Sequence, residues 1–312
     1  MDKLLIITGP TATGKTSLGI ELAKKFNGEI ISADSRQVYK FMDIGTGKDR
    51  EEYLRNEIKV WGIDLVNPDY NFNVSDFVNY AIKAIHDMQI RGKLPIIVGG
   101  TALYIKALLE PFETIGVPPN KKLRNELQNY SLDTLQKKLK KTDQNKWRKM
   151  NQSDRKKPRR LIRAIEVAMS THKRNSPNSP KFPLILSLTA SFDFLYPRID
   201  NRVDDRIKQG AAQEVQKLLN LGYSFNLPGM TASGYKEFKD ANYVQQWKFD
   251  EHAYARRQIS FINKFFCEKA HQFDIEKPNW QSEVLNLVGQ WYSSTDDPKE
   301  DKTGHRLAKE EI

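Results

Sequence analysis

Gly9-Pro-Thr-Ala-Thr-Gly-Lys-Thr16 is the stretch of sequence that decides the fold. It matches the phosphate-loop (P-loop) pattern G-x-x-x-x-G-K-[ST] at every defined position. The apolar run 3–8 predicts a buried parallel strand before it, and the spacing of apolar residues over 15–26 predicts a helix after it. Glycines let backbone N–H groups approach phosphate oxygens, and the helix start adds its dipole. The stretch therefore predicts a phosphate site, whose ligand can be a nucleotide or another diphosphate.

Strands and helices alternate through the first third of the chain. Further strands are predicted over 28–33 and 93–100, and helices over 75–91 and 101–110. This alternation is typical of a parallel α/β sheet. Together with the phosphate loop, it predicts an α/β fold whose sheet core is P-loop NTPase-like.

The pattern changes after Pro118-Pro119. Helices are predicted over 121–141 and 153–171 with no strand between them, and three prolines in 174–183 indicate a linker. A strand at 184–190 then resumes the core, followed by two helical stretches. We therefore expect a basic helical insertion within an α/β core. The expected ranges are 1–113 and 184–292 for the core with its C-terminal helices (198–221 and about 250–273), 114–183 for the insertion, and 293–312 for a charged tail whose composition predicts disorder.

The charge of the chain is concentrated in that insertion. The net charge is +11, and residues 120–163 contain 16 basic and 4 acidic side chains, a net of +12. The remaining 268 residues contain 34 basic and 35 acidic side chains, a net of −1. Such a patch suits a polyanion, although a solvated lysine-rich hairpin would have the same composition.

Polar residues follow two of the predicted strands, at the ligand-binding edge of such a sheet. Asp34 follows 28–33, and can act as a general base, support Mg²⁺, or cap a following helix. Thr101 follows Gly99-Gly100, and can present its hydroxyl at this edge or serve as an N-cap.

A predicted helix near 198 carries Arg198, Arg202 and Arg206 at intervals of four, on one face. Such a face can hold a diphosphate. The alternative is a set of surface pairs with Asp200, Asp204 and Asp205.

The remaining composition excludes several protein classes. The single cysteine, Cys267, excludes internal disulfides and cysteine-based metal clusters, and the five histidines show no metal-ligand spacing. No run of apolar residues is long enough for a transmembrane helix, and the start of the chain lacks signal-peptide features. We expect a cytoplasmic monomer that does not act at a membrane.

Seven motifs, in order along the chain, carry a family resemblance. They are GPTATGKT, ISADSRQVYKFMDIGTGK, VGGTALYIKALLE, RRLIRAIEV, RIDNRVDD, GYKE and YARRQ. Over roughly residues 3–270 the chain resembles the tRNA dimethylallyltransferase (tRNA isopentenyltransferase) family, of the bacterial type without a zinc finger. It departs from the usual family pattern at GTGKDR, at Ser233 and at Ser260–Asn263.

The resemblance implies transfer of a dimethylallyl group from dimethylallyl diphosphate to N6 of the adenine 3′-adjacent to the anticodon. Asp34 matches the family's general base, and Thr101 a residue of the channel between donor and tRNA. Mg²⁺ is the implied cofactor, with Thr16 as its ligand, while Lys15 and Arg202 stabilise the leaving diphosphate. The diphosphate-binding residues are Gly9, Pro10, Thr11, Ala12, Thr13, Gly14, Lys15 and Thr16.

The implied second partner is the anticodon stem-loop of tRNA. The residues expected to bind it are Asp34, Ser35, Arg36, Gln37, Thr101, Arg124, Arg159, Arg160, Leu161, Ile162, Arg163, Lys236, Arg256 and Arg257. Three alternatives share the phosphate loop: an adenylate isopentenyltransferase, a nucleotide-gated RNA-binding protein and a small-molecule kinase. The basic segment 120–163 argues against the first and last, and the intact Asp34 against the second.

Overall fold

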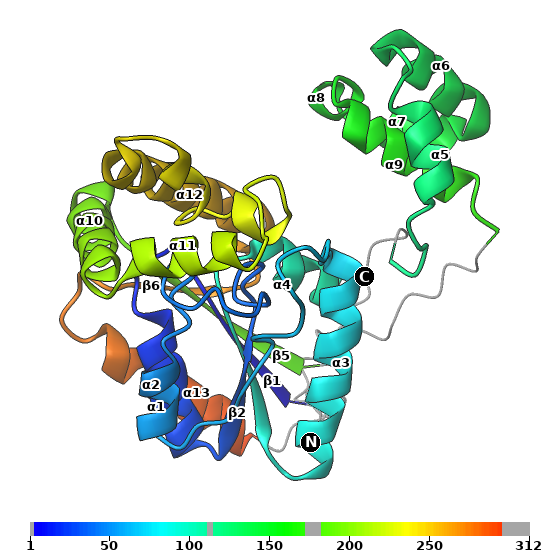
Figure 1. Ribbon diagram of the computed structural model, residues 1–312. Helices are drawn as coiled ribbons and strands as arrows, with labels where there is room; N and C mark the ends of the chain where they lie inside the picture. Colours follow the sequence, from blue (N-terminus) through cyan, green and yellow to red (C-terminus); the bar gives the residue numbers. More distant parts are fainter. Residues whose placement is uncertain (1–2, 111–114, 172–181, 295–312) are drawn as a thin grey trace, which may run out of the picture.

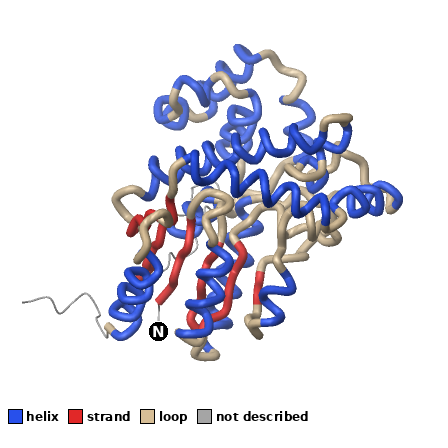
Figure 2. Tube along the Cα trace, turned by 90° about the vertical axis from the view of Figure 1, so that its left-hand side faces the viewer, coloured by secondary structure: helices blue, strands red, loops and turns tan. Residues whose placement is uncertain are grey.

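The computed structural model describes residues 3–110, 115–171 and 182–294. Its centre is a six-stranded parallel sheet in the order β3-β2-β4-β1-β5-β6. Figures 1 and 2 show helices packed around this sheet. The strands are β1 (Lys3–Thr8), β2 (Gly28–Ser32), β3 (Val60–Trp61), β4 (Leu94–Val98), β5 (Phe182–Thr189) and β6 (His271–Asp274). The predicted α/β fold class is confirmed.

Both faces of the sheet are covered, because successive residues of its central strand point to opposite sides. Leu4 and Ile6 of β1 pack toward helices α3 (Val74–Ile90) and α4 (Ala102–Leu109). Leu5 and Ile7 pack toward α1 (Lys15–Lys25) and α13 (Trp280–Ser293). All four side chains are fully buried, which explains why this strand reads as a continuous apolar run.

The sequence predictions differ from the structure mainly at the two edges of the sheet. The edge strands β3 and β6, and helix α13, were not predicted. The helix expected over 250–273 is wrong at both ends: α12 runs from Tyr243 to Phe266, and His271–Asp274 is strand β6. Short edge strands carry little periodicity, and β6 is recognisable only by its pairing with β5.

The helix expected over 198–221 is two helices. They are α10 (Phe192–Lys208) and α11 (Ala211–Asn220), and Gly210 separates them with a φ of 102°. Glycine adopts this left-handed backbone without the penalty of a Cβ, so it allows the chain to turn between the helices. Together with α12, these helices lie across the carboxyl end of the sheet (Figure 1).

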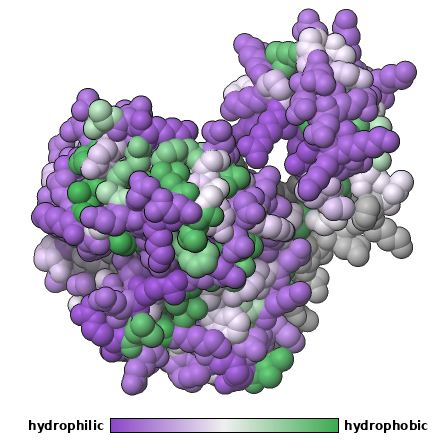
Figure 3. Space-filling view, viewed as in Figure 1, coloured by the Kyte–Doolittle hydropathy of each residue, from purple (hydrophilic) through white to green (hydrophobic). Residues whose placement is uncertain are grey.

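The helical insertion forms a separate group of helices with its own core. Helices α5 (Lys121–Leu127), α6 (Leu132–Thr142), α7 (Gln144–Lys149), α8 (Gln152–Arg155) and α9 (Pro158–Ala168) lie apart from the sheet in Figure 1. Leu135 and Leu139 of α6 pack against Leu161 and Ile165 of α9. The surface of this group is mostly hydrophilic in Figure 3. The predicted linker 174–183 lies largely outside the described residues, as does most of the predicted disordered tail.

The remaining described elements are short. They are α2 (Arg50–Arg55) and the 3-10 helices η1 (Gly229–Thr231) and η2 (Lys236–Lys239). Across the described ranges, every helix is too short or too polar to cross a lipid bilayer.

Candidate active site

A cavity of about 770 Å³ opens at the carboxyl end of the sheet, between the phosphate loop, the loops after β2 and β4, and helices α10 and α12. Its volume is in the usual range for a small-molecule site. It brings together predicted residues from distant parts of the chain. Those on its wall are Thr11, Ala12, Gly14, Lys15, Thr16, Asp34, Ser35, Arg36, Gln37, Arg202, Lys236 and Arg257.

The phosphate loop connects β1 to α1, as predicted. Gly9 has a φ of 149°, and a Cβ there would lie 2.6 Å from the Leu188 carbonyl oxygen. Glycine therefore allows the loop to pass close to β5. The Lys15 ammonium donates to the Pro10 carbonyl at 2.5 Å, so its side chain folds back over the loop. The predicted loop residues Gly9, Pro10 and Thr13 are not among the residues that line the cavity.

Lys15 has an unusual electrostatic environment. Burial and the nearby Arg202 guanidinium lower the pKa of Lys15 to about 7, although the Asp34 carboxylate acts in the opposite direction. Lysine ordinarily titrates near 10.4. Near neutral pH the phosphate loop is therefore ready to gain a positive charge when an anion enters.

We expect diphosphate binding to take up a proton at Lys15, because a bound anion raises the pKa of a neighbouring amine. Without a bound anion the Lys15 amine is mostly neutral above pH 7, so the affinity for an organic diphosphate should fall between pH 7.5 and 9, by up to about tenfold per pH unit. Calorimetry in two buffers of different ionisation enthalpy measures the proton uptake. The Lys15→Arg variant keeps its charge throughout and serves as the control for ionisation of the diphosphate. An equal pH dependence in both proteins would contradict this role of Lys15.

Asp34 lies on the wall of the same cavity, on the turn after β2. Its Oδ1 accepts a hydrogen bond from the Arg36 N–H at 2.7 Å, and the Ser35 N–H donates to Thr101 Oγ1 at 3.0 Å. No helix follows directly, so the alternative of a helix N-cap is not what the structure shows at Asp34. Its free carboxylate oxygen can act as a base. Thr101 is the N-cap residue of α4, but its side chain makes no capping hydrogen bond to that helix.

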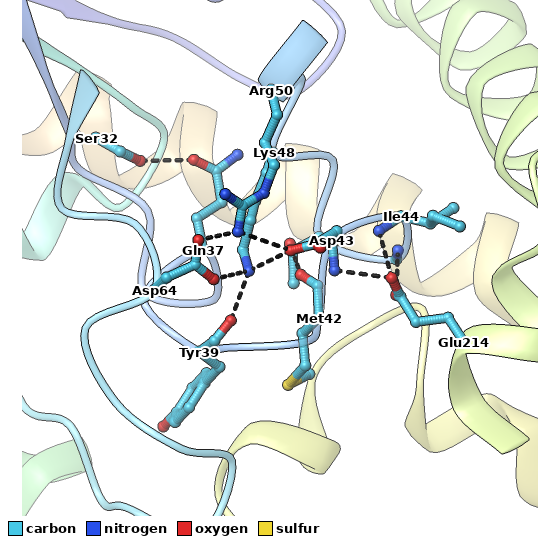
Figure 4. Close-up of polar contacts among 12 residues, drawn as sticks. Ser32, Gln37, Tyr39, Met42, Asp43, Ile44, Lys48, Arg50, Asp64 and Glu214 are labelled. Carbon is cyan, nitrogen blue, oxygen red and sulfur yellow. Dashed lines mark hydrogen bonds and ion pairs between the residues drawn. The ribbon is translucent and has the colours of Figure 1, made fainter. Parts of the chain in front are cut away.

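The loop 41–50, which contains the family departure GTGKDR, is held by two side chains (Figure 4). The Glu214 carboxylate of α11 accepts from the N–H groups of Asp43, Ile44 and Gly45, at 2.9–3.1 Å. Lys48, only 1% exposed, donates to the Tyr39 carbonyl and is paired with Asp43 and Asp64. Sequence reasoning missed both Glu214 and Lys48, because their partners are backbone groups or lie far along the chain.

The arginine face of α10 points toward the phosphate loop. Arg198 Nε donates to the Ala12 carbonyl at 2.9 Å, Arg202 to Thr11 Oγ1 at 3.3 Å, and Arg206 to the Gly45 carbonyl at 3.1 Å. Burial and the Arg202 charge lower the pKa of Arg206 to about 10.

The alternative of local surface pairs within α10 is therefore wrong for these arginines. The neighbouring aspartates have other partners: Asp200 contacts His252, Asp204 pairs with Lys248, and Asp205 pairs with Lys208. All three arginines line the same cavity as the phosphate loop, and Arg202 also lies 3.7 Å from the Asp49 carboxylate.

The predicted tRNA-binding residues of the insertion fall into two groups. The first group makes contacts within the insertion itself. Arg124 and Arg163 both bind the Glu166 carboxylate, which is 2% exposed. Burial would raise the pKa of Glu166, but hydrogen bonds from these arginines outweigh it and lower the pKa. The Leu161 side chain is fully buried, and Ile162 packs against the same core. These four residues hold the insertion together, whatever their contacts with RNA.

The other predicted RNA contacts are exposed or lie on α12 and η2. Arg159 is exposed, and Arg160, also exposed, is paired with Asp154. Lys236 pairs with Asp250 at 2.5 Å, and Arg256 donates to the Tyr196 hydroxyl at 2.7 Å. None of Arg124, Arg159, Arg160, Leu161, Ile162, Arg163, Arg256 and Thr101 lies on the wall of the cavity. Apart from the residues on the turn after β2, Lys236 and Arg257 are the predicted RNA contacts that line the cavity.

Three further cavity residues were not predicted individually. Tyr53 and Tyr254 both line the cavity, and burial raises the pKa of both phenols, so they stay protonated. Gln258 contacts both the phosphate loop and the loop after β4. Gln258 is part of YARRQ, but sequence alone does not show that its side chain points inward.

The predicted magnesium site fits the residues present. Among the described residues there is no cluster of three or more His, Cys, Asp or Glu able to hold a metal. Mg²⁺ at phosphate sites usually needs only one or two protein oxygens, with substrate phosphates and water completing its shell. The Thr16 hydroxyl and the carboxylates of Asp34 and Asp49 line one cavity and match that requirement.

Comparison with known proteins agrees with this arrangement. The protein family described as IPP transferase matches residues 37–265. The chain belongs to that family. This IPP transferase is 39% identical, over 303 residues, to the tRNA dimethylallyltransferase of Clostridioides difficile, covering 91% of this chain and 96% of that one. It is 42% identical over 284 residues to the tRNA dimethylallyltransferase of Acetivibrio thermocellus, covering 85% and 90%.

Solved structures show the same likeness. The IPP transferase chain superimposes on a eukaryotic dimethylallyltransferase acting on tRNA with a TM-score of 0.81 at 27% identity, covering 93% of this chain and 79% of that one. Against the tRNA isopentenylpyrophosphate transferase of Bacillus halodurans the TM-score is 0.69 at 32% identity, with 94% and 97% covered. The family resemblance seen in the motifs is confirmed.

Proposed function

We propose that this IPP transferase moves a dimethylallyl group from dimethylallyl diphosphate to N6 of the adenine 3′-adjacent to the anticodon in tRNA, releasing diphosphate. The observation that carries the proposal is the position of Lys15 and Asp34 on one cavity wall, close enough for their charges to interact. An anion-binding loop and a carboxylate base are the two parts that such a transfer needs. The names of its relatives supply the acceptor.

The proposed reaction forms one C–N bond and breaks one C–O bond. The adenine N6 lone pair attacks the allylic carbon, while the bond from that carbon to the diphosphate oxygen breaks and its electron pair leaves with the diphosphate. Asp34 takes the proton that N6 loses, which helps because an exocyclic amine is a weak nucleophile. The acceptor adenine must leave its stack to enter the cavity.

The protein side of the leaving-group site is cationic. Lys15, protonated once the anion is bound, and Arg202 would stabilise the negative charge that develops on the diphosphate. Mg²⁺, held through Thr16 with the carboxylates of Asp34 and Asp49 nearby, would neutralise diphosphate charge when bound. The backbone of residues 9–16 would hold the phosphates.

The proposal extends to the partner and setting of the protein. The insertion, with its +12 segment, would grip the anticodon stem-loop through phosphate contacts. We propose that the protein acts as a monomer in the cytoplasm, where tRNA is found, and not at a membrane.

The test uses labelled dimethylallyl diphosphate and three acceptors. They are an anticodon stem-loop with adenine 3′ of the anticodon, the same stem-loop with guanine at that position, and free AMP. We expect Mg²⁺-dependent label in the first acceptor alone. Label only in AMP would instead support an adenylate isopentenyltransferase, and label in none would contradict prenyl transfer.

A further inference from the structure

Gln258 lies in helix α12, between the phosphate loop and the loop after β4. The proposed reaction depends on the relative position of these two loops. Its side chain is 5% exposed. Its Oε1 accepts a hydrogen bond from the Thr11 N–H of the phosphate loop at 2.9 Å. Its Nε2 donates to the Gly100 carbonyl, in the loop after β4, at 3.0 Å. One buried side chain therefore joins both loops.

The two backbone partners have opposite polarity, and this makes the amide group difficult to replace. Thr11 offers a donor and Gly100 an acceptor. A primary amide supplies one acceptor and one donor at the same end of a side chain, whereas a carboxylate supplies acceptors only and a hydrocarbon neither. A Cβ at position 100 would lie 2.0 Å from Gln258 Nε2, so glycine at that position is what allows the amide to approach.

The two hydrogen bonds of Gln258 connect the loop that would hold the donor with the turn that carries Asp34. Thr11 is part of the loop that ends in Lys15 and Thr16, which would hold the donor. Gly100 precedes Thr101, whose Oγ1 accepts the N–H of Ser35, the residue after Asp34. Three hydrogen bonds and the Gly100–Thr101 peptide bond thus connect the donor loop, through Gln258, to the turn that carries the base.

We propose that Gln258 is a positioning residue that sets the distance between the phosphate loop and Asp34, and so aligns the donor carbon with the acceptor amine. This inference rests on the proposed function. Gln258 accepts from the Thr11 N–H and contributes no group to the phosphates, so its effect falls on alignment rather than on donor affinity. A displacement of about 1 Å in such a site can lower the rate by about 10²-fold.

The test compares Gln258→Leu and Gln258→Glu with the wild type on the stem-loop acceptor. Gln245→Leu, an exposed position on the same helix, is the matched control. We expect kcat of both Gln258 variants to fall by about 10²-fold, while affinities for dimethylallyl diphosphate and for the stem-loop stay close to those of the wild type. The control should behave as the wild type. A merely structural role would lower both affinities together with the thermal midpoint of unfolding.

A pH series separates alignment from general damage. A protonated carboxyl offers one O–H donor and one carbonyl acceptor, the same pattern as the amide. Burial beside a carbonyl oxygen raises the pKa of the introduced carboxyl. The single-turnover rate of Gln258→Glu, divided by that of the wild type, should therefore rise as pH falls, while the ratio for Gln258→Leu stays level.

Three results would overturn the inference: wild-type turnover in Gln258→Leu, a loss of donor affinity that matches the loss of rate, or a ratio for Gln258→Glu that does not change with pH. Failure of the proposed function looks different, because the wild type itself would then transfer no label to the stem-loop.

Discussion

Asp34→Asn is expected to lower turnover on the stem-loop acceptor by about 10²–10⁴-fold, the usual contribution of a well-placed general base. The amide oxygen of asparagine can still accept the Arg36 N–H bond that Asp34 Oδ1 accepts at 2.7 Å, so the turn after β2 should keep its conformation. What the variant loses is the ability to take the proton from adenine N6. Single-turnover rates with saturating donor and RNA measure this loss directly.

The controls for Asp34→Asn are the two binding equilibria. Affinity for the stem-loop should be unchanged, because the basic segment 120–163 lies outside the cavity that contains Asp34. Donor affinity should change little, since the phosphate loop and the arginines of α10 remain. Near-normal turnover at saturation would remove Asp34 from the role of base. A loss confined to donor affinity would assign it to the Mg²⁺ site instead.

The combined replacement of Lys156, Lys157 and Arg159 by alanine is expected to weaken stem-loop binding strongly and to make it less salt-dependent. All three side chains are exposed on the insertion. If each contacts one phosphate, the log–log salt slope should fall in magnitude by about 2–3. If wild type and variant bind equally at 1 M salt, the variant should then bind about 10²–10³-fold more weakly at 0.1 M salt. Donor binding should not change, because the cavity wall contains none of these residues. Filter binding over a salt series measures the slope.

A matched variant tests whether location or net charge matters. Replacing Lys24, Lys25 and Lys83 by alanine removes the same charge from exposed positions of α1 and α3 in the core. This variant should keep the wild-type slope. Equal effects of both variants would show that the insertion is only a solvated surface. Arg163 is unsuitable for this test, because its bond to buried Glu166 makes it part of the insertion's own structure.

The core strands and the phosphate loop could be predicted because their signals are local. β1 is apolar at every position from Leu4 to Ile7, and the loop after it needs glycine at fixed spacing. The edge strands could not, because Val60–Trp61 and His271–Asp274 are too short to show a period and depend on their neighbours for pairing. The boundary between α10 and α11 was missed because a lone glycine inside a helical pattern is often tolerated.

Pairing between side chains was predicted less well than secondary structure. The sequence places Arg198, Arg202 and Arg206 on one helix face, but it leaves open whether they face nearby aspartates or the phosphate loop. Only the packing of α10 over the sheet places Arg198 and Arg202 against the phosphate loop. Likewise, Arg163 reads as one more cation of a basic stretch, while the fold uses it to neutralise Glu166.

The sequence by itself determined the α/β class, the phosphate loop, the helical insertion between β4 and β5, and the family. These follow from local periodicity, glycine spacing and charge counted along the chain, which need no knowledge of distant contacts. The tertiary structure alone decided that Lys15 and Asp34 share a cavity, that Glu214 and Lys48 hold the loop 41–50, and that Gln258 joins Thr11 to Gly100. These contacts join residues whose separation along the chain follows no fixed spacing. They form only because the parallel strands end at one edge of the sheet and α10–α12 pack across it, where buried polar groups need hydrogen-bond partners.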